Sequence, residues 1–367
     1  MTATASQTDR DLQDLAARPG DRELLTRLAS QGLAILPPLA DYLASDLPIE
    51  LLESYEELWK AILRRTLSGE VDGPTARELA AFQKQVGLLL KYKTYAVKAS
   101  SPLGYSVFLQ NPAEGFSFQR HVTHKVEVFH ILEVHPGGFV FLCTYEEWCA
   151  AYDPARFAAW LLGGRPDPAY DRFKFPATPG DVFVLDRLGI VHTVIGCVLE
   201  EFATISTDMV DRLHDQNAGK TIPSHFNRPF VQERLRTLRT PDASRLVSGP
   251  ASDPRVSSLL PVDIPGGRKT VLADGFVAAT HYRIEPHAET AALLDPTCAA
   301  SLYIRSGRGR ILLGTPAEMA RASTPSLPVA ANDLLTIPHR ISYAFSNEDG
   351  EPLEVVEHKI HPGVALF

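Results

Sequence analysis

The stretch Gln119-Arg120-His121-Val122-Thr123-His124-Lys125-Val126-Glu127 places amide, imidazole, ammonium and carboxylate side chains close together in the chain. Its β-branched residues predict a strand, in which alternate side chains point to the same face. If the strand is unbroken, His124 and His130 point to one face. The opposite face then carries Gln119, His121, Lys125 and Glu127. This parity predicts a cluster of metal ligands with a cation beside it.

A second segment, about sixty-five residues further on, supplies one more imidazole. Gly180-Asp181 predicts a turn, a short apolar strand follows, and a turn at Gly189 leads to His192. We therefore predict a metal site made of Gln119, His121, Glu127 and His192. Two neutral imidazoles, one carboxylate and an amide leave a divalent cation with net positive charge and room for a substrate oxygen. Such a site acts as a Lewis acid.

The surrounding sequence predicts a mainly β protein. Short runs rich in Val, Phe, Tyr and Thr, cut by Gly and Pro, begin near residue 96, whereas residues 1–95 show apolar stripes with helical spacing. A Pro-rich polar span separates two such β regions. The predicted division is a helical N-terminal region (1–95), a metal-binding domain (96–220), a linker (221–267) and a second β-domain (268–367).

Composition narrows the class of partner. The 367 residues carry a formal net charge of -8, which gives no electrostatic footprint for nucleic acid or an anionic membrane. The N-terminus lacks the pattern of a secretory signal, and the four cysteines form no CxxC pair or zinc-finger spacing. We expect a cytoplasmic protein with free thiols that acts on a small molecule, with a homodimer possible.

Four ordered blocks resemble the cupins, and among them the class I mannose-6-phosphate isomerases. The blocks are Gln119-Arg120-His121, Lys125-Val126-Glu127-Val128-Phe129, Gly180-Asp181 with Val191-His192-Thr193, and Thr207-Asp208-Met209-Val210-Asp211-Arg212. The resemblance covers roughly residues 105–220. It implies two tandem cupin (jelly-roll) β-barrels, zinc held by the four predicted ligands, and Lys125 and Arg212 as catalytic residues near the substrate.

The C-terminal domain resembles a second cupin that has lost its metal. Residues 302–309 are similar to the glycine turn of cupins, and Asn332-Asp333 to their second turn. Tyr343 occupies the position at which that motif would hold a histidine. A structural or dimerising role is the expectation for this domain.

Three functions compete. The first is a metal-dependent sugar or sugar-phosphate isomerase, for which the resemblance implies Zn, with Fe(II), Mn or Ni as other divalent metals. The second is a non-haem Fe(II) cupin oxygenase acting on a small molecule, because two histidines and one carboxylate also bind catalytic iron. The third is a non-catalytic carbohydrate-binding cupin, in which Lys125 and Arg212 grip an anionic ligand.

Overall fold

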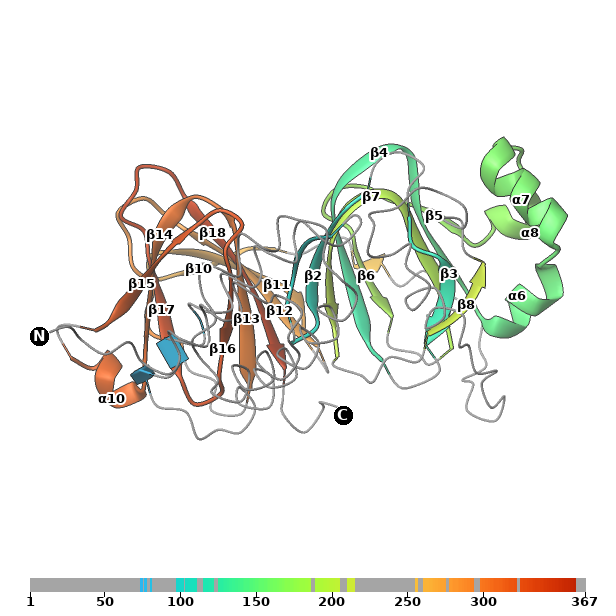
Figure 1. Ribbon diagram of the computed structural model, residues 1–367. Coiled ribbons are helices and arrows are strands. Elements are labelled where there is room, and N and C mark those ends of the chain that lie inside the picture. Colours follow the sequence, from blue (N-terminus) through green and yellow to red (C-terminus); the bar gives the residue numbers. More distant parts are fainter. Residues whose placement is uncertain are drawn as a thin grey trace, which may run out of the picture. The chain divides into compact units, whose positions relative to one another are not determined.

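The computed structural model describes two compact units within the chain (Figure 1). The structure describes the helical residues 73, 74, 76, 77 and 80 and the ranges 97–101, 103–110, 115–121, 125–185, 189–204, 210–214, 255–256, 260–274, 277–293, 298–321 and 324–360. One unit holds residues 107–214 and 255–256, and the other holds the described residues before 107 and after 258. No helix in these ranges is long and apolar enough to cross a bilayer.

The first unit is built on strands of one nine-stranded sheet, whose strand residues before 107 are counted with the other unit. Its path runs β1-β2-β7-β4-β6-β9, with β3 paired to β7 and β8, and β5 paired to β4. The strands are β1 (Val97–Ser100), β2 (Tyr105–Leu109), β3 (Phe118–His121), β4 (Glu127–Cys143), β5 (Lys174–Pro176), β6 (Val182–Leu185), β7 (Val191–Ala203), β8 (Val210–His214) and β9 (Arg255–Val256).

The apolar runs in the sequence predict two strands in place of β4, at 126–132 and 139–144, and two in place of β7, at 191–195 and 202–206. Both β4 and β7 are continuous, with a register shift between Val134 and Phe139 that bends the pair. At the bend Gly138 and Gly196 approach closely, and a Cβ on Gly138 would lie 2.7 Å from the carbonyl oxygen of Gly196. The two strands can thus serve both walls of the barrel, because a bulge re-aims a strand without ending its pairing.

Three helices are inserted between β4 and β5: α6 (Tyr145–Ala151), α7 (Pro154–Gly163) and α8 (Pro168–Asp171). The sequence pattern predicts one helix in this region, over residues 154–162, and it corresponds to α7. Thr144 caps α6 in a capping box with Glu147, and Asp153 caps α7, which has Pro at its start. In Figure 1 the helices lie beside β3, β5 and β8 of the same unit.

The insertion fixes the position of β3 through aromatic packing. Phe118 on β3 contacts Phe141, Trp148 and Phe157, with ring centroids 5.1, 5.8 and 4.8 Å away. All four rings are almost fully buried. Because aromatic pairs with this geometry add to the gain from burial, the helices hold the strand that carries Gln119 and His121.

The second unit is a sandwich of two antiparallel sheets. A six-stranded sheet has the order β10-β11-β12-β18-β13-β16, and a three-stranded sheet the order β15-β14-β17. The strands are β10 (Val262–Ile264), β11 (Gly267–Ala273), β12 (Ala278–Ile284), β13 (Ala299–Ser306), β14 (Arg308–Gly314), β15 (Ser326–Ala330), β16 (Leu334–Ile337), β17 (Ser342–Ser346) and β18 (Leu353–Ile360), with one helical turn, α10 (Pro316–Met319).

The core of this unit lies between its two sheets and includes two residues from far earlier in the chain. Ala76 and Ala80 are fully buried in the same cluster as Leu302 and Phe345. Arg77 donates a hydrogen bond to the carbonyl oxygen of Leu313 at 2.9 Å. The described part of the predicted N-terminal helical region therefore packs on the C-terminal barrel.

The predicted fold class is confirmed for the described residues, which are mainly β and form two tandem cupin barrels. Most of the predicted helical region before residue 96 lies outside the described residues. Within the span predicted as a linker, β9 pairs with β6 and β10 pairs with β11. The domain boundaries stay predictions.

Candidate metal centre

Three of the four predicted ligands meet inside the first barrel. His121 Nε2 lies 3.2 Å from Glu127 Oε1, and His192 Nε2 lies 3.2 Å from Glu127 Oε2. The ligand atoms of the three residues lie within 4.8 Å of one another, and all three side chains are buried. In the described part of the chain, these three residues form the one group of three or more His, Cys, Asp or Glu side chains whose ligand atoms lie close enough together to hold a metal ion.

The protonation states suit a cation. The Nδ1–H of His192 donates to the carbonyl oxygen of Ile190 at 3.0 Å, which leaves Nε2 with its lone pair when the ring is neutral. Burial lowers the pKa of His192 to about 4, so the ring is neutral at physiological pH. Burial acts to raise the pKa of Glu127, but His121 and Lys125 outweigh it and hold that pKa well below its usual range.

The residues present therefore fit a divalent metal. A neutral imidazole nitrogen and an ionised carboxylate oxygen face each other over 3.2 Å in a buried space, and His192 Nε2 has no hydrogen-bond partner among the described residues. Two lone pairs in this arrangement repel unless a cation lies between them. The donor set of two imidazoles and one carboxylate is common to zinc, iron and other divalent first-row metals.

For Gln119 as a metal ligand, the support comes from strand pairing. On β3 it is the cross-strand partner of His192 on β7, so both side chains share a face. Its Oε1 accepts a hydrogen bond from Ser117 Oγ at 2.9 Å. A carbonyl oxygen has a second lone pair, so Gln119 as the fourth ligand remains a prediction.

Arg212 extends the same row by one strand. It is the partner of Gln119 on β8, and its Nη1 donates to Ser117 Oγ. Because neighbouring strands lie about 5 Å apart, Arg212 and His192 are on the order of 10 Å apart across β3. The predicted catalytic cation is therefore on the site's face of the sheet, beyond the ligands.

Lys125 is the cation closest to the ligands, and it is joined to a second carboxylate. Its Nζ lies 2.8 Å from Glu127 Oε1 and 3.6 Å from Glu201 Oε1. Glu201 is opposite Phe129 in the β4–β7 register and thus on the face of Glu127. The sequence prediction does not include Glu201, since only the pairing of two distant strands brings it to the site.

The predicted alternation of side chains over residues 119–130 is found in part. An unbroken strand over 119–127 is wrong, because β3 ends at His121 and β4 begins at Glu127. The two strands nevertheless bring His121 and Glu127 together. His130 is directed away from the site, as predicted, and its Nδ1 lies 2.9 Å from Glu200 Oε2. His124, Thr207 and Asp208 lie outside the described residues.

The opposite face of β3 is locked by a buried ion pair. Arg120 is fully buried, and its Nε and Nη2 lie 2.9 and 2.8 Å from Asp211 Oδ2 on β8. The guanidinium carbon also lies 3.1 Å from the centroid of the Tyr145 ring at the start of α6. One residue on β3 thus ties together β8 and the helical insertion, between the positions of Gln119 and His121.

The second barrel has a different cluster where the first has its ligands. Its register matches the first: Glu127 faces Leu185 and Ala203, and Ala300 faces Ile337 and Lys359. The acidic ligand is therefore replaced by Ala300. Glu201 pairs with the residue two positions after Glu127, and Glu357 pairs with the residue two positions after Ala300. Glu357 therefore takes the place of Glu201.

Two phenols close this second cluster around Glu357. Tyr282 Oη donates to Glu357 Oε2 at 3.2 Å, and Tyr343 Oη donates to Oε1. Tyr343 is the residue predicted to replace the metal-binding histidine. Burial raises the pKa of Glu357, although Lys359 and the phenols act in the opposite direction. Hydrogen-bonded side chains thus take the place of the metal ligands in this barrel.

Glu357→Gln should remove a pH-dependent loss of stability. A carboxyl whose pKa is raised on folding contributes stability that is present below its unfolded pKa and is lost as pH rises through the folded pKa. The free energy of unfolding of the variant, minus that of the parent, should therefore increase as pH rises from 5 to 8. Each pKa unit by which folding raises the pKa of Glu357 is worth about 1.4 kcal/mol of this increase. Urea unfolding at both pH values measures this. An equal stability difference at both would contradict it.

Comparison with known proteins adds only a distant structural likeness. No family model matches the sequence, and no curated protein shows a significant match. Oxalate decarboxylase from Bacillus subtilis aligns with a TM-score of 0.44 and 16% identity, over 69% of this chain and 66% of that chain. The formate complex of the Lactobacillus farciminis enzyme gives 0.40 and 12%, over 70% and 76%. The chain thus spans just under two thirds of the first enzyme, and the fold assignment depends on the strand order and register above.

Proposed function

We propose that the chain is a metal-dependent enzyme that interconverts an aldose and a ketose, with a sugar or sugar phosphate as substrate. The supporting observation is the charged chain Glu201–Lys125–Glu127, which ends on the buried group of His121 and His192. It places groups that exchange protons directly beside a position suited to a divalent cation. The motifs shared with class I mannose-6-phosphate isomerases point to the same reaction.

The reaction requires two things of the protein. One proton must leave a carbon and be returned to its neighbour, and negative charge that develops on the adjacent oxygens must be stabilised. A divalent cation held by His121, Glu127 and His192 would supply positive charge to those oxygens. No oxidant or reductant is consumed, because the aldose and the ketose are isomers.

Side chains of the chain account for the remaining steps. The carboxylate of Glu201 can accept the proton, and the ammonium of Lys125 can donate one to a substrate oxygen on the same face. Both side chains are mostly buried, at 15% exposed each, so water is largely kept from them. Arg212, two strands from His192, is placed to hold an anionic group at the far end of the substrate.

The metal predicted for this function is zinc, with Fe(II), Mn and Ni as candidates that the same ligands accept. One observation favours the oxygenase: the Oε1 atom of Gln119 already accepts a hydrogen bond from Ser117, whereas His121, Glu127 and His192 lie close together. A set of three ligands leaves more open positions for oxygen and substrate.

A single set of assays separates the candidates. The metal-free protein is reconstituted with Zn, Fe(II), Mn or Ni, and conversion of fructose-6-phosphate to mannose-6-phosphate is followed beside oxygen uptake. Zinc-dependent isomerisation that is lost in His192→Ala is expected. Iron-dependent oxygen uptake without isomerisation would overturn the proposal in favour of the oxygenase. Sugar binding without turnover would favour the carbohydrate-binding cupin.

Lys125→Met should separate chemistry from metal binding. The ammonium lies 2.8 Å from a ligand carboxylate and repels a cation there, so its removal should leave the metal affinity unchanged or higher. The isomerase rate should fall by at least about 100-fold, the usual effect of losing a proton-transfer group. Metal titration and single-turnover rates of the loaded variant measure both. A parallel loss of metal and activity would contradict a role in proton transfer.

A further inference from the structure

A groove of about 420 Å³ lies on the first unit away from the metal centre. One wall is the bend of β4 and β7, from Pro136 to Phe139 with Ile195 and Gly196, and the other is the end of α7 with the loop that follows it. None of the candidate metal ligands lines it. Its volume is in the range of small-molecule sites.

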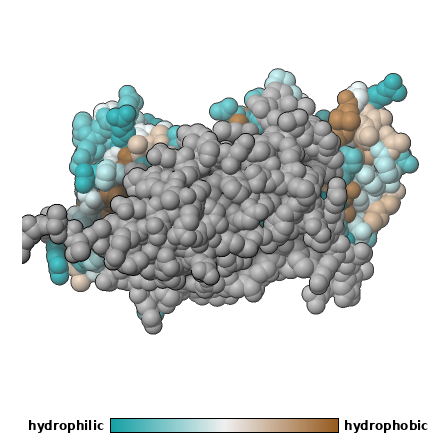
Figure 2. All heavy atoms as spheres, in the orientation of Figure 1, coloured by the Kyte–Doolittle hydropathy of each residue, from teal (hydrophilic) through white to brown (hydrophobic). Residues whose placement is uncertain are grey.

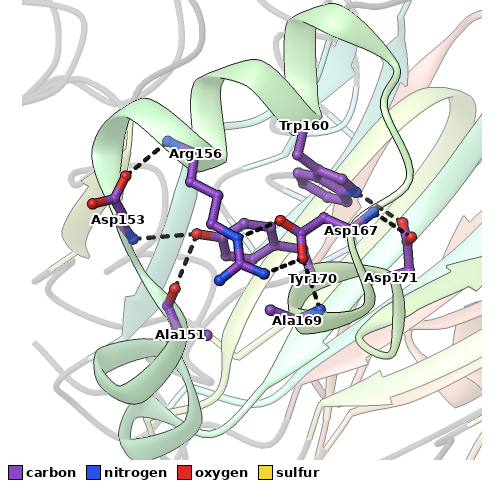
Figure 3. Close-up of polar contacts among 8 residues, drawn as sticks. All are labelled: Ala151, Asp153, Arg156, Trp160, Asp167, Ala169, Tyr170 and Asp171. Carbon is purple, nitrogen blue, oxygen red and sulfur yellow. Dashed lines mark hydrogen bonds and ion pairs between the residues drawn. The ribbon is translucent and has the colours of Figure 1, made fainter.

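The loop that forms the second wall is rigidly built. Arg156 pairs with both carboxylate oxygens of Asp167, through Nε at 2.5 Å and Nη2 at 2.6 Å (Figure 3). Asp171 accepts hydrogen bonds from Trp160 Nε1 at 2.8 Å and from the backbone N–H of Asp167 at 2.7 Å. Gly164, with a φ of 60°, turns the chain out of α7 and leaves open space where a side chain would stand.

Two cations line the groove, and neither forms an ion pair with a residue that the structure describes. Lys174 Nζ lies 4.5 Å from the centroid of the Phe139 ring, so an aromatic face holds it in place of a carboxylate. Arg165 lies on the loop after Gly164 and is exposed. The acidic residue of the lining, Asp171, already uses both oxygens within the loop.

The groove also has an exposed apolar wall. The side chain of Leu162 is 78% exposed, and Pro136 and Pro166 are exposed beside it. Figure 2 shows hydrophobic residues among hydrophilic ones in the region where Figure 1 places α6–α8. Two cations in the lining next to an apolar wall match an amphipathic anion.

We propose that this groove binds a small organic anion, with its carboxylate or phosphate at Lys174 and Arg165 and its apolar part along Leu162. The site is separate from the metal centre and does not depend on the isomerase proposal. The shared chemistry is an anionic head on a short apolar tail.

Isothermal titration calorimetry with octanoate and octyl phosphate tests this on the full chain after removal of metal with EDTA and dialysis, so that no heat comes from coordination to a metal, and the groove variants below distinguish the groove from the metal centre. One saturable site is expected for both compounds. The compound that binds more tightly shows whether the groove prefers a carboxylate or a phosphate. Octanol and inorganic phosphate, each with half of the chemistry, should bind much more weakly.

Variants define the site. Lys174→Gln and Arg165→Gln should each weaken octyl phosphate binding by about two- to fivefold, as expected for a partly exposed charged contact. Arg172→Gln is the matched control, because Arg172 is an exposed arginine next to α8 that does not line the groove. The proposal is overturned if octanol binds as tightly as octyl phosphate, if the groove variants behave like Arg172→Gln, or if no saturable heat appears.

Discussion

His192→Ala is expected to lower the affinity of the protein for Zn²⁺ by at least about 100-fold, because even changes to groups behind a metal ligand cost 10- to 100-fold. The variant removes the imidazole whose unprotonated Nε2 faces Glu127 across 3.2 Å. Isomerase activity should fall with the metal. Equilibrium titration against a competing chelator measures the affinity, and circular dichroism shows whether the variant is folded.

The matched control for this result is His281→Ala. His281 also lies on a strand and faces a carboxylate, Glu354, at 3.6 Å, but it belongs to the second barrel. It should bind metal as the parent does. If the two variants bind Zn²⁺ equally well, or if His192→Ala keeps full affinity, His192 is not a ligand.

Asp211→Ala is expected to cost about 3–5 kcal/mol of free energy of unfolding, the usual penalty for leaving a buried charge without its partner. Arg120 is fully buried and its guanidinium contacts Asp211 at 2.8 and 2.9 Å. Since the pair ties β3 to β8, the variant should also bind metal less tightly. Urea unfolding and metal titration measure the two effects.

The double variant Arg120→Met with Asp211→Ala distinguishes an ion pair from simple packing. Replacing both partners leaves no uncompensated charge, so the double variant should be more stable than Asp211→Ala alone. If Asp211→Ala lies within about 1 kcal/mol of the parent, the guanidinium is compensated elsewhere and the pair is not what positions β3.

Much of the fold could be predicted from local patterns, and the missing parts have identifiable causes. The strands Val182–Leu185 and Leu334–Ile337 have the bounds of the apolar runs that directly follow the predicted turns at Gly180-Asp181 and Asn332-Asp333. The continuity of β4 is not predictable in this way, because a Pro-Gly-Gly sequence such as that at 136–138 is typical of a turn between two strands. The capping box of Thr144 and Glu147 could have revealed α6.

The site was predictable where ligand chemistry and motif order agree, as for His121, Glu127 and His192. Glu201 could not be found from spacing, because it is brought to Lys125 only by the register of β7 against β4. Ser117, which contacts both Gln119 and Arg212, has no pattern of its own in the sequence. These contacts come from the pairing of distant strands, which local periodicity does not contain.

The most direct test of the metal centre is metal analysis of the purified protein combined with X-ray absorption spectroscopy at the bound metal's edge. One ion per chain is predicted, with a first shell of nitrogen and oxygen donors that includes two imidazoles, one of which disappears in His192→Ala. A shell containing sulfur, a shell without imidazole, or a protein that takes up no Zn, Fe, Mn or Ni would contradict the site formed by His121, Glu127 and His192.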